Sequence, residues 1–170
     1  HQTFLWVELG LQTIHEATAI ACNRGYPLST YDQAVSALIK RKIYIVTHLI
    51  LGLPGETPND MVASVKYVTR GINNQPPIYG IKLHLLNVVK GSALAATHPE
   101  YSPFSSPQEY IDLICDLLPQ IPWAVTIHRL TGDVPRKLLI APEWSYKKRT
   151  ILNGILHEMN RRKKIQGCDL

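Results

Sequence analysis

Six polar side chains recur at alternate positions in segments that otherwise have the pattern of apolar strands. Residues 5–12, 43–51, 80–89 and 123–130 each have one apolar alternating face and one mixed face. The polar residues of the mixed faces are Glu8, Gln12, His48, Lys82, His84 and His128. Burying several ionisable groups is unfavourable unless a ligand, a metal or a partner satisfies them. We therefore expect this face to bind a ligand, although one such residue alone is more often a hydrogen-bonded structural group.

Familiar catalytic patterns are absent from the sequence. It has no Ser-His-Asp order, no His-Glu-x-x-His, no paired-cysteine zinc pattern and no Walker loop. The three cysteines, Cys22, Cys115 and Cys168, stand far apart without metal-ligand spacing. The glycine loop at residues 52–55 lacks the lysine of a phosphate loop, which leaves a tight turn and a ligand-contacting loop equally open. We assign no catalytic residue and no metal ligand.

Helical patterns separate the four strand-like segments. A short helix is expected over residues 17–22, and Thr30 with Gln33 has the spacing of a capping box for the next one. Thr57 is the expected cap of a third helix that stops near Gly71, with a loop at 73–77. A fourth opens at Ser106. The last helix, roughly residues 145–162, is predicted to pack through Ile151, Leu152, Ile155, Leu156 and Met159.

Alternation of strand and helix four times predicts an α/β fold with parallel strands and right-handed crossovers. A parallel sheet buried on both faces would have near-continuous apolar strands, whereas these have one mixed face. That asymmetry is typical of a barrel wall, and four strands cannot close a barrel. We therefore predict a partial (β/α) barrel, an open arc of about four mainly parallel strands with outer helices. Residues 1–144 would form the barrel portion and residues 145–170 a basic C-terminal helix packed on it.

Composition indicates a globular protein. The chain has 170 residues, 45% of them hydrophobic, with no apolar run of membrane-spanning length and no signal peptide. We expect a cytoplasmic protein without a membrane partner. Its first residue is His1, which indicates a piece of a longer protein. Residues 129–170 carry ten Lys or Arg against four Asp or Glu, so either this quarter binds nucleic acid or it has a solvated helix face.

Five short motifs resemble, in order, those of radical S-adenosylmethionine (SAM) enzymes. They are Glu8-Leu-Gly-Leu-Gln12, Asn23-Arg-Gly25, the run from His48 to Glu56, Lys82-Leu-His84, and His128-Arg-Leu-Thr-Gly-Asp133. The closest resemblance is to the YhcC-type subgroup, related to oxygen-independent coproporphyrinogen dehydrogenase and to elongator-type tRNA-modifying proteins. The resemblance implies the C-terminal half of a partial barrel in which a [4Fe–4S] cluster reductively cleaves SAM to a 5′-deoxyadenosyl radical.

The resemblance also implies a cofactor-binding set. Gln12 and Arg24 match the residues that contact the sugar and methionine parts of SAM, and an Arg fork suits a carboxylate. Glu8 would accept from ribose hydroxyls or the amino group, and Ile50 and Gly52 match the stretch beside adenine. This chain departs from the family in having His48 at the first glycine and Glu56 one position late. From the mixed strand faces, His48 and His84 complete the set.

The family's C-x-x-x-C-x-x-C loop has no counterpart here. We expect that loop, and with it the cluster, upstream of His1, so the full-length protein would be an enzyme and this fragment inactive. RNA is a candidate substrate, on the basis of the tRNA-modifying relatives and the basic C-terminus. The alternative is a non-catalytic small-molecule-binding or scaffolding barrel fragment. A half barrel with an exposed edge strand is also expected to self-associate.

Overall fold

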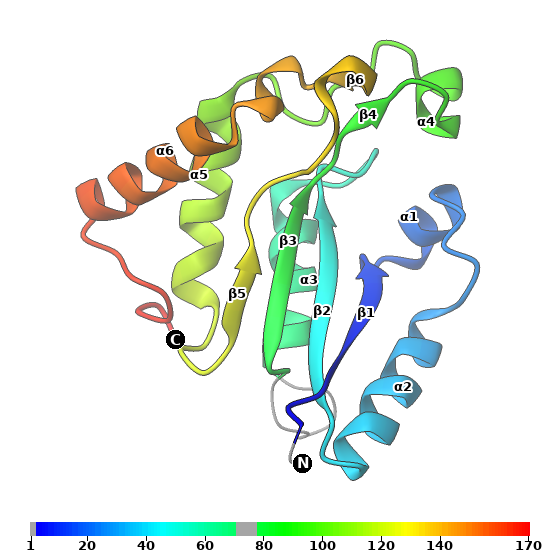
Figure 1. Cartoon of the computed structure of the whole chain (residues 1–170), viewed down its shortest axis with the longest axis vertical. Helices are drawn as coiled ribbons and strands as arrows, with labels where there is room; N and C mark the ends of the chain where they lie inside the picture. The colour runs from blue at the N-terminus through cyan, green and yellow to red at the C-terminus, as the bar shows by residue number, and fades with distance from the viewer. Residues whose placement is uncertain (1–2, 71–77) are drawn as a thin grey trace.

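The protein is built on one sheet of four parallel strands. The computed structural model describes residues 3–70 and 78–170, so the predicted loop at 73–77 lies outside the described residues. The strands are β1 (Trp6–Gln12), β2 (Tyr44–Leu51), β3 (Gly80–Leu85) and β5 (Thr126–Arg129), side by side in that order. The α/β fold with four parallel strands is therefore confirmed, and Figure 1 shows the sheet as a twisted arc with two open edges.

Helices cover one face of this sheet and leave the other open (Figure 1). They are α2 (Leu28–Lys40), α3 (Pro58–Thr69) and α5 (Pro107–Leu117), while α1 (Glu16–Ala21) follows the end of β1 and α6 (Lys148–Arg161) packs on α5. The covered face of β2 carries Ile45, Thr47, Leu49 and Leu51, all buried as the period-two pattern predicts. Thr47 is satisfied there by the hydroxyl of Tyr31 at 2.7 Å. Among the described helices, none is long and apolar enough to cross a membrane.

A second, two-stranded sheet lies beyond the C-terminal ends of the main strands (Figure 1). Residues 80–89 do not form the single strand that their pattern predicts. They divide into β3 and a short β4 (Val88–Val89), which pairs antiparallel with β6 (Leu139–Ala141). The short helix α4 (Ala93–Thr97) follows β4, and three 3-10 helices occupy Leu118–Gln120, Arg136–Leu138 and Glu143–Tyr146. The small sheet forms one wall of the site described below.

Two of the three predicted helix caps are confirmed, at Thr57 and at Ser106, whose hydroxyl accepts from the backbone N–H of Glu109, and the one at Thr30 is not. Thr57 caps α3 through a reciprocal capping box with Asp60, as its spacing predicts. The predicted box of Thr30 and Gln33 was wrong, because α2 already begins at Leu28 after Pro27 and Thr30 lies within its first turn. Proline at this boundary has a fixed φ and fits immediately before a helix, which places the helix start earlier.

Helix α6 buries a narrower stripe than its sequence predicts. Ile151, Ile155 and Met159 are buried, but Leu152 and Leu156 are 43% and 63% exposed. The helix packs against α5 alone among its long neighbours, and Gly154 allows a close approach, since a Cβ there would lie 2.5 Å from the Cδ1 of Ile111. Because packing against a single helix covers only one side of α6, the two leucines remain at the surface.

Gly52 is predicted to be irreplaceable on two counts. Its φ is +88°, and an added Cβ would lie 2.5 Å from the Cβ of Pro103. Gly52→Ala should lose roughly 2–5 kcal/mol of unfolding free energy, from left-handed backbone strain plus overpacking. Gly55→Ala is the matched control, because Gly55 has φ +85° but nothing within 4 Å of the added Cβ. It should lose only the backbone component of about 1–2 kcal/mol. Equal losses in urea denaturation would show that the Pro103 contact is unimportant.

Candidate functional site

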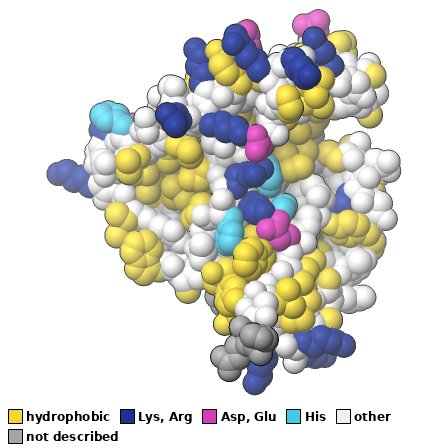
Figure 2. All heavy atoms as spheres, viewed as in Figure 1, with side chains coloured by type: hydrophobic (Ala, Val, Ile, Leu, Met, Phe, Trp, Pro, Cys, Tyr) yellow, Lys and Arg dark blue, Asp and Glu magenta, His cyan; other side chains and the backbone are white. Residues whose placement is uncertain are grey.

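A carboxylate at the middle of the open face joins three neighbouring strands. Glu8 of β1 lies 2.6 Å from the Lys82 ammonium of β3 and 2.8 Å from Nε2 of His48 on β2. The indole of Trp6 donates to its other oxygen at 3.3 Å. The parallel register makes this possible, since His48 pairs with Gly10 on one side and Lys82 on the other. Figure 2 shows the resulting stripe of charged and histidine side chains running up the face.

The charge state of Glu8 follows from these contacts. The hydrogen bond from Lys82 is the main reason that the pKa of Glu8 falls to about 2. Glu8 is therefore ionised at neutral pH and forms an ion pair, which makes it a poor general base. Its contribution to stability is present above its ordinary pKa and is lost as the pH falls toward about 2.

Two histidines continue this stripe toward the C-terminal end of the sheet. The rings of His48 and His84 lie 5.2 Å apart. Burial is the main cause that lowers the pKa of His84 to about 4, and His48 and Arg129 add to it. Nε2 of His84 is buried and has no hydrogen-bond partner among the described residues. A neutral imidazole with an unused nitrogen is a group to which a ligand can bind.

A cavity of about 380 Å³ lies at this end of the sheet, at the small end of the range for small-molecule sites. Four of the seven predicted cofactor-binding residues line it: Gln12, His48, Ile50 and His84. The last residues of β3 and β5, the segments that follow them and β4 complete it with Leu85, Leu86, Asn87, Val89, Arg129, Gly132, Asp133 and Val134. The strands therefore bring together most of the predicted set, at the sheet end where parallel α/β folds bind ligands.

Gln12 reaches this cavity because of a bulge in β1. The pairing register shifts between Gly10 and Gln12, and Gln12 has φ +64°. Its side chain lies back over Gly10, where an added Cβ would come within 2.8 Å of Nε2. Oε1 of Gln12 is buried and has no hydrogen-bond partner in the described ranges. Gln12 and His84 thus line one cavity, and each has one polar atom without a partner in the described residues.

The other three predicted residues, Glu8, Arg24 and Gly52, do not line this cavity; Glu8 forms the ion pair described above. The Arg24 side chain is 2% exposed and binds the carbonyl oxygen of Thr13 at 2.7 Å and that of Tyr26 at 2.8 Å, with Glu16 beside it at 3.2 Å. Its guanidinium therefore fixes the loop after β1 in this structure, and a role toward a ligand carboxylate stays a prediction. Gly52 is buried, and its carbonyl accepts from the hydroxyl of Tyr101 at 2.8 Å.

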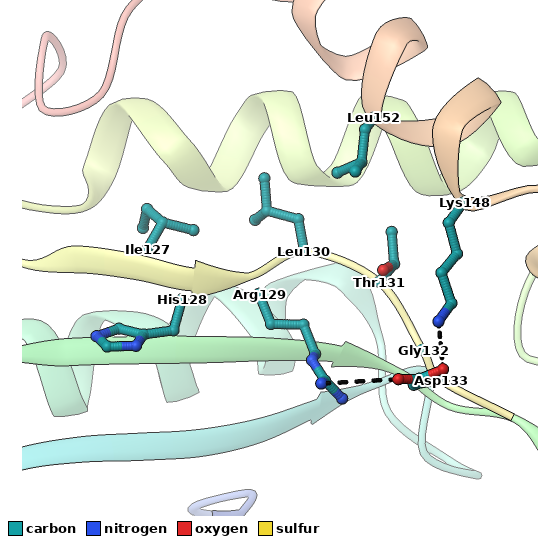
Figure 3. A pocket seen from close by; sticks show the side chains of 9 residues that line it. All are labelled: Ile127, His128, Arg129, Leu130, Thr131, Gly132, Asp133, Lys148 and Leu152. Carbon is teal, nitrogen blue, oxygen red and sulfur yellow. Dashed lines mark hydrogen bonds and ion pairs between the residues drawn. The ribbon is translucent and has the colours of Figure 1, made fainter.

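Arg129 is a site residue that the period-two pattern missed. The register between β3 and β5 shifts after Ile81, so that Lys82 pairs with Arg129 instead of His128. His128 is left beside Gly80, where an added Cβ would lie 2.5 Å from its ring. In the sequence, only the motif at residues 128–133 indicated that the segment around Arg129 contributes to the site. Figure 3 shows Arg129 and Lys148 reaching Asp133 from different sides, at the edge of a neighbouring cavity of about 450 Å³.

The low pKa of His84 predicts a pH dependence of stability. Between pH 6.5 and about 4 the unfolded chain binds a proton at this position and the folded chain does not, so stability should fall as the pH falls through that window. Replacing His84 by Gln should remove this component. Urea denaturation in steps across the window, for both proteins, measures it. An imidazole that titrates by NMR at its ordinary pKa would contradict the burial of His84.

Comparisons with known proteins agree with this geometry. Residues 78–161 match the Radical_SAM C-terminal domain. The chain is 39% identical over 167 residues to YtqA of Bacillus subtilis (strain 168). This alignment covers 98% of this chain and 50% of YtqA. It is 32% identical over 141 residues to YhcC of Escherichia coli (strain K12), covering 82% and 44%. It therefore spans about half the length of these relatives or less.

More distant similarities extend the comparison. A tRNA uridine(34) acetyltransferase of Dehalococcoides mccartyi (strain CBDB1) is 28% identical over 137 residues, covering 79% of this chain and 29% of that protein. The solved structure of Methanocaldococcus infernus Elp3 with an N-terminal deletion superposes with a TM-score of 0.79 at 21% identity, covering 95% of this chain and 37% of that one. At that identity it shows the fold. By its domain match and its relatives, the chain belongs to the radical SAM superfamily, in the YhcC-type subgroup.

Proposed function

We propose that this chain supplies the SAM-contacting strands of a radical SAM enzyme. The observation that carries the proposal is the cavity at the C-terminal end of β1, β2 and β3, which is lined by Gln12 and His84, two side chains that each have one buried polar atom without a partner in the described part of the chain. Burial of an unsatisfied polar atom is unfavourable, and a ligand with complementary donors and acceptors removes that penalty. Family membership makes SAM the leading candidate.

The residues of the cavity fit the parts of SAM. The amide of Gln12 would accept and donate at the ribose or the amino group, and Ile50 offers an apolar surface for the adenine ring. His84 stays neutral and holds a hydrogen-bonding nitrogen beside the ligand without adding charge. With a [4Fe–4S] cluster, bound SAM would supply a 5′-deoxyadenosyl radical. In this proposal, the chain itself orients the cofactor and covers it from one side.

The cysteines of this chain do not fit such a cluster. Cys22 and Cys168 are exposed, and Cys115 is buried with a thiol pKa raised to about 11 by burial. Within residues 3–70 and 78–170 no group of three or more His, Cys, Asp or Glu side chains could hold a metal ion. We propose that the cluster ligands belong to a part of the parent protein outside this chain, and that this chain alone does not cleave SAM.

Replacing Gln12 by Ala should weaken SAM binding in the parent-length protein by about 1–3 kcal/mol, because a buried hydrogen-bond partner of the ligand is removed. Isothermal titration calorimetry on the anaerobically reconstituted protein measures the change. Gln33→Ala is the matched control, since Gln33 is exposed on α2 away from the cavity. Equal affinities for both variants would exclude Gln12 from the SAM site. An absence of SAM binding in the unmodified protein would favour the non-catalytic alternative.

RNA as the substrate remains a proposal. The ion pairs of residues 161–164 make these residues a poor candidate for the RNA-binding surface. Three of the four basic residues at 161–164 are paired: Arg161 with Glu158, Arg162 with Glu158, Asp112 and Asp116, and Lys164 with Asp169. These pairs leave little charge for phosphates. The tail therefore favours the solvated-helix interpretation over RNA contact.

A better candidate is an upper basic patch, which we define as Lys90, Arg136, Lys137 and Lys147. All four are exposed and have no ion-pair partner among the described residues. The backbone of Lys90 binds that of Leu138, and Arg136 lies 4.4 Å from the ring centre of Tyr146, so the patch gathers over the small sheet. Dark blue side chains cluster over this upper part of the molecule in Figure 2. A similar protein named for tRNA adds support.

Binding of unfractionated tRNA should weaken with salt, and the triple change of Lys90, Arg136 and Lys137 to Gln should flatten that dependence. The log–log slope should fall by about 0.7 for each phosphate that the variant no longer neutralises. Fluorescence anisotropy across a salt series measures the slope. The control removes the same charge elsewhere, from the exposed Lys40, Arg41 and Arg70. If both triple variants behave alike, the upper basic patch has no specific role.

A further inference from the structure

Arg129 lines the cavity with a guanidinium that has no anionic partner within hydrogen-bond distance among the described residues. It extends from the edge strand β5 over the open face, level with Lys82 in the register, and lines the 380 Å³ cavity. Its nearest charged partner is Asp133, with NH2 and Oδ2 3.9 Å apart, beyond hydrogen-bond distance. Across the described residues, its guanidinium makes no hydrogen bond. Its donors are therefore available in a partly enclosed space.

Asp133 neutralises Arg129 only in part, because it also pairs with Lys148. Its other oxygen accepts a hydrogen bond from Lys148, and this contact is the main cause that lowers the pKa of Asp133. Figure 3 shows Lys148 reaching Asp133 from α6 and Arg129 reaching it from β5. Two cations thus share one carboxylate. Since Glu8 and Lys82 balance each other across the face, one positive charge remains at Arg129.

Neighbouring groups make this charge suited to an anion. Nε2 of His84 is buried without a partner in the part of the chain that the structure describes. Both side chains line the same cavity, which also has apolar walls formed by Ile50, Leu86 and Val134. A guanidinium fork matches the two oxygens of a carboxylate or phosphate group. The apolar walls suit the remainder of a small organic molecule.

We propose that Arg129 and His84 form an oxyanion subsite, which binds a small organic molecule through a carboxylate or phosphate group while its apolar part lies against Leu86 and Val134. The subsite is formed by β3 and β5, on the side of the cavity away from Gln12 of β1. It does not rest on the proposed function, because it uses only contacts within this chain. Its ligand is a small organic anion whose charged group lies at the C-terminal ends of β3 and β5.

Phenyl phosphate and benzoate are suitable probes, because they share a ring and differ in the anionic group. Benzyl alcohol serves as the neutral control. Each is titrated into the 170-residue chain at constant ionic strength and followed through the His84 ring resonances by NMR. We expect one or both anions to shift these resonances saturably, and benzyl alcohol to bind at least about 10-fold more weakly, since it lacks the charge-assisted bonds. Whichever anion binds more tightly identifies the group.

Arg129→Gln should weaken binding of the preferred anion about 10-fold or more. Arg129→Lys keeps the positive charge but loses the guanidinium fork, so its affinity should lie between those of the unmodified chain and Arg129→Gln. Arg149→Gln is the matched control, because Arg149 is exposed and does not line the cavity. Circular dichroism checks that the variants fold. The proposal is overturned if neither anion shifts His84, if benzyl alcohol binds as tightly as the anions, or if Arg129→Gln and Arg149→Gln bind equally well.

Discussion

The contact of one carboxylate with three strands organises the open face of this sheet. Glu8 accepts from Lys82 at 2.6 Å and contacts His48 at 2.8 Å, so β1, β2 and β3 are joined by side chains as well as by their backbone ladders. An ion pair on a surface without a covering layer contributes little by itself. Its importance here is positional, because it fixes His48, which lies against His84 at the edge of the cavity. The apolar face below, packed on helices, provides the rigid support.

The period-two pattern predicted the sheet well and the site incompletely, for a physical reason. It correctly assigned Ile45, Leu49 and Leu51 to the covered face and His48 to the open one. It fails wherever a bulge inserts a residue, and both edge strands carry a register shift. The shift in β5 exchanges His128 for Arg129 beside Lys82. No local feature of the sequence indicates which residue is the extra one, because this is decided by the neighbouring strand and by the space above Gly80.

Tertiary contacts also decide which charges are available. The cluster at residues 161–164 stands out in the sequence, yet three of its four cations are paired with Glu158, Asp112, Asp116 or Asp169. Arg161 and Arg162 lower the pKa of Glu158 to about 2. Lys90 and Arg136 are far apart in the sequence and come together through the pairing of β4 with β6, an element absent from the predicted pattern. Counting charges by sequence window therefore gives the sign of the charge, but it does not show which cations are already paired within the fold. Self-association of the chain stays a prediction.

The central claim is that the open face of this sheet binds the cofactor at the C-terminal ends of its strands. The most direct measurement is an anaerobic crystal structure of the parent-length protein with SAM. The account predicts density for SAM in contact with Gln12 and Ile50, with His84 bordering the same cavity. Density for SAM elsewhere, or a cavity filled by side chains of the parent protein, would contradict it.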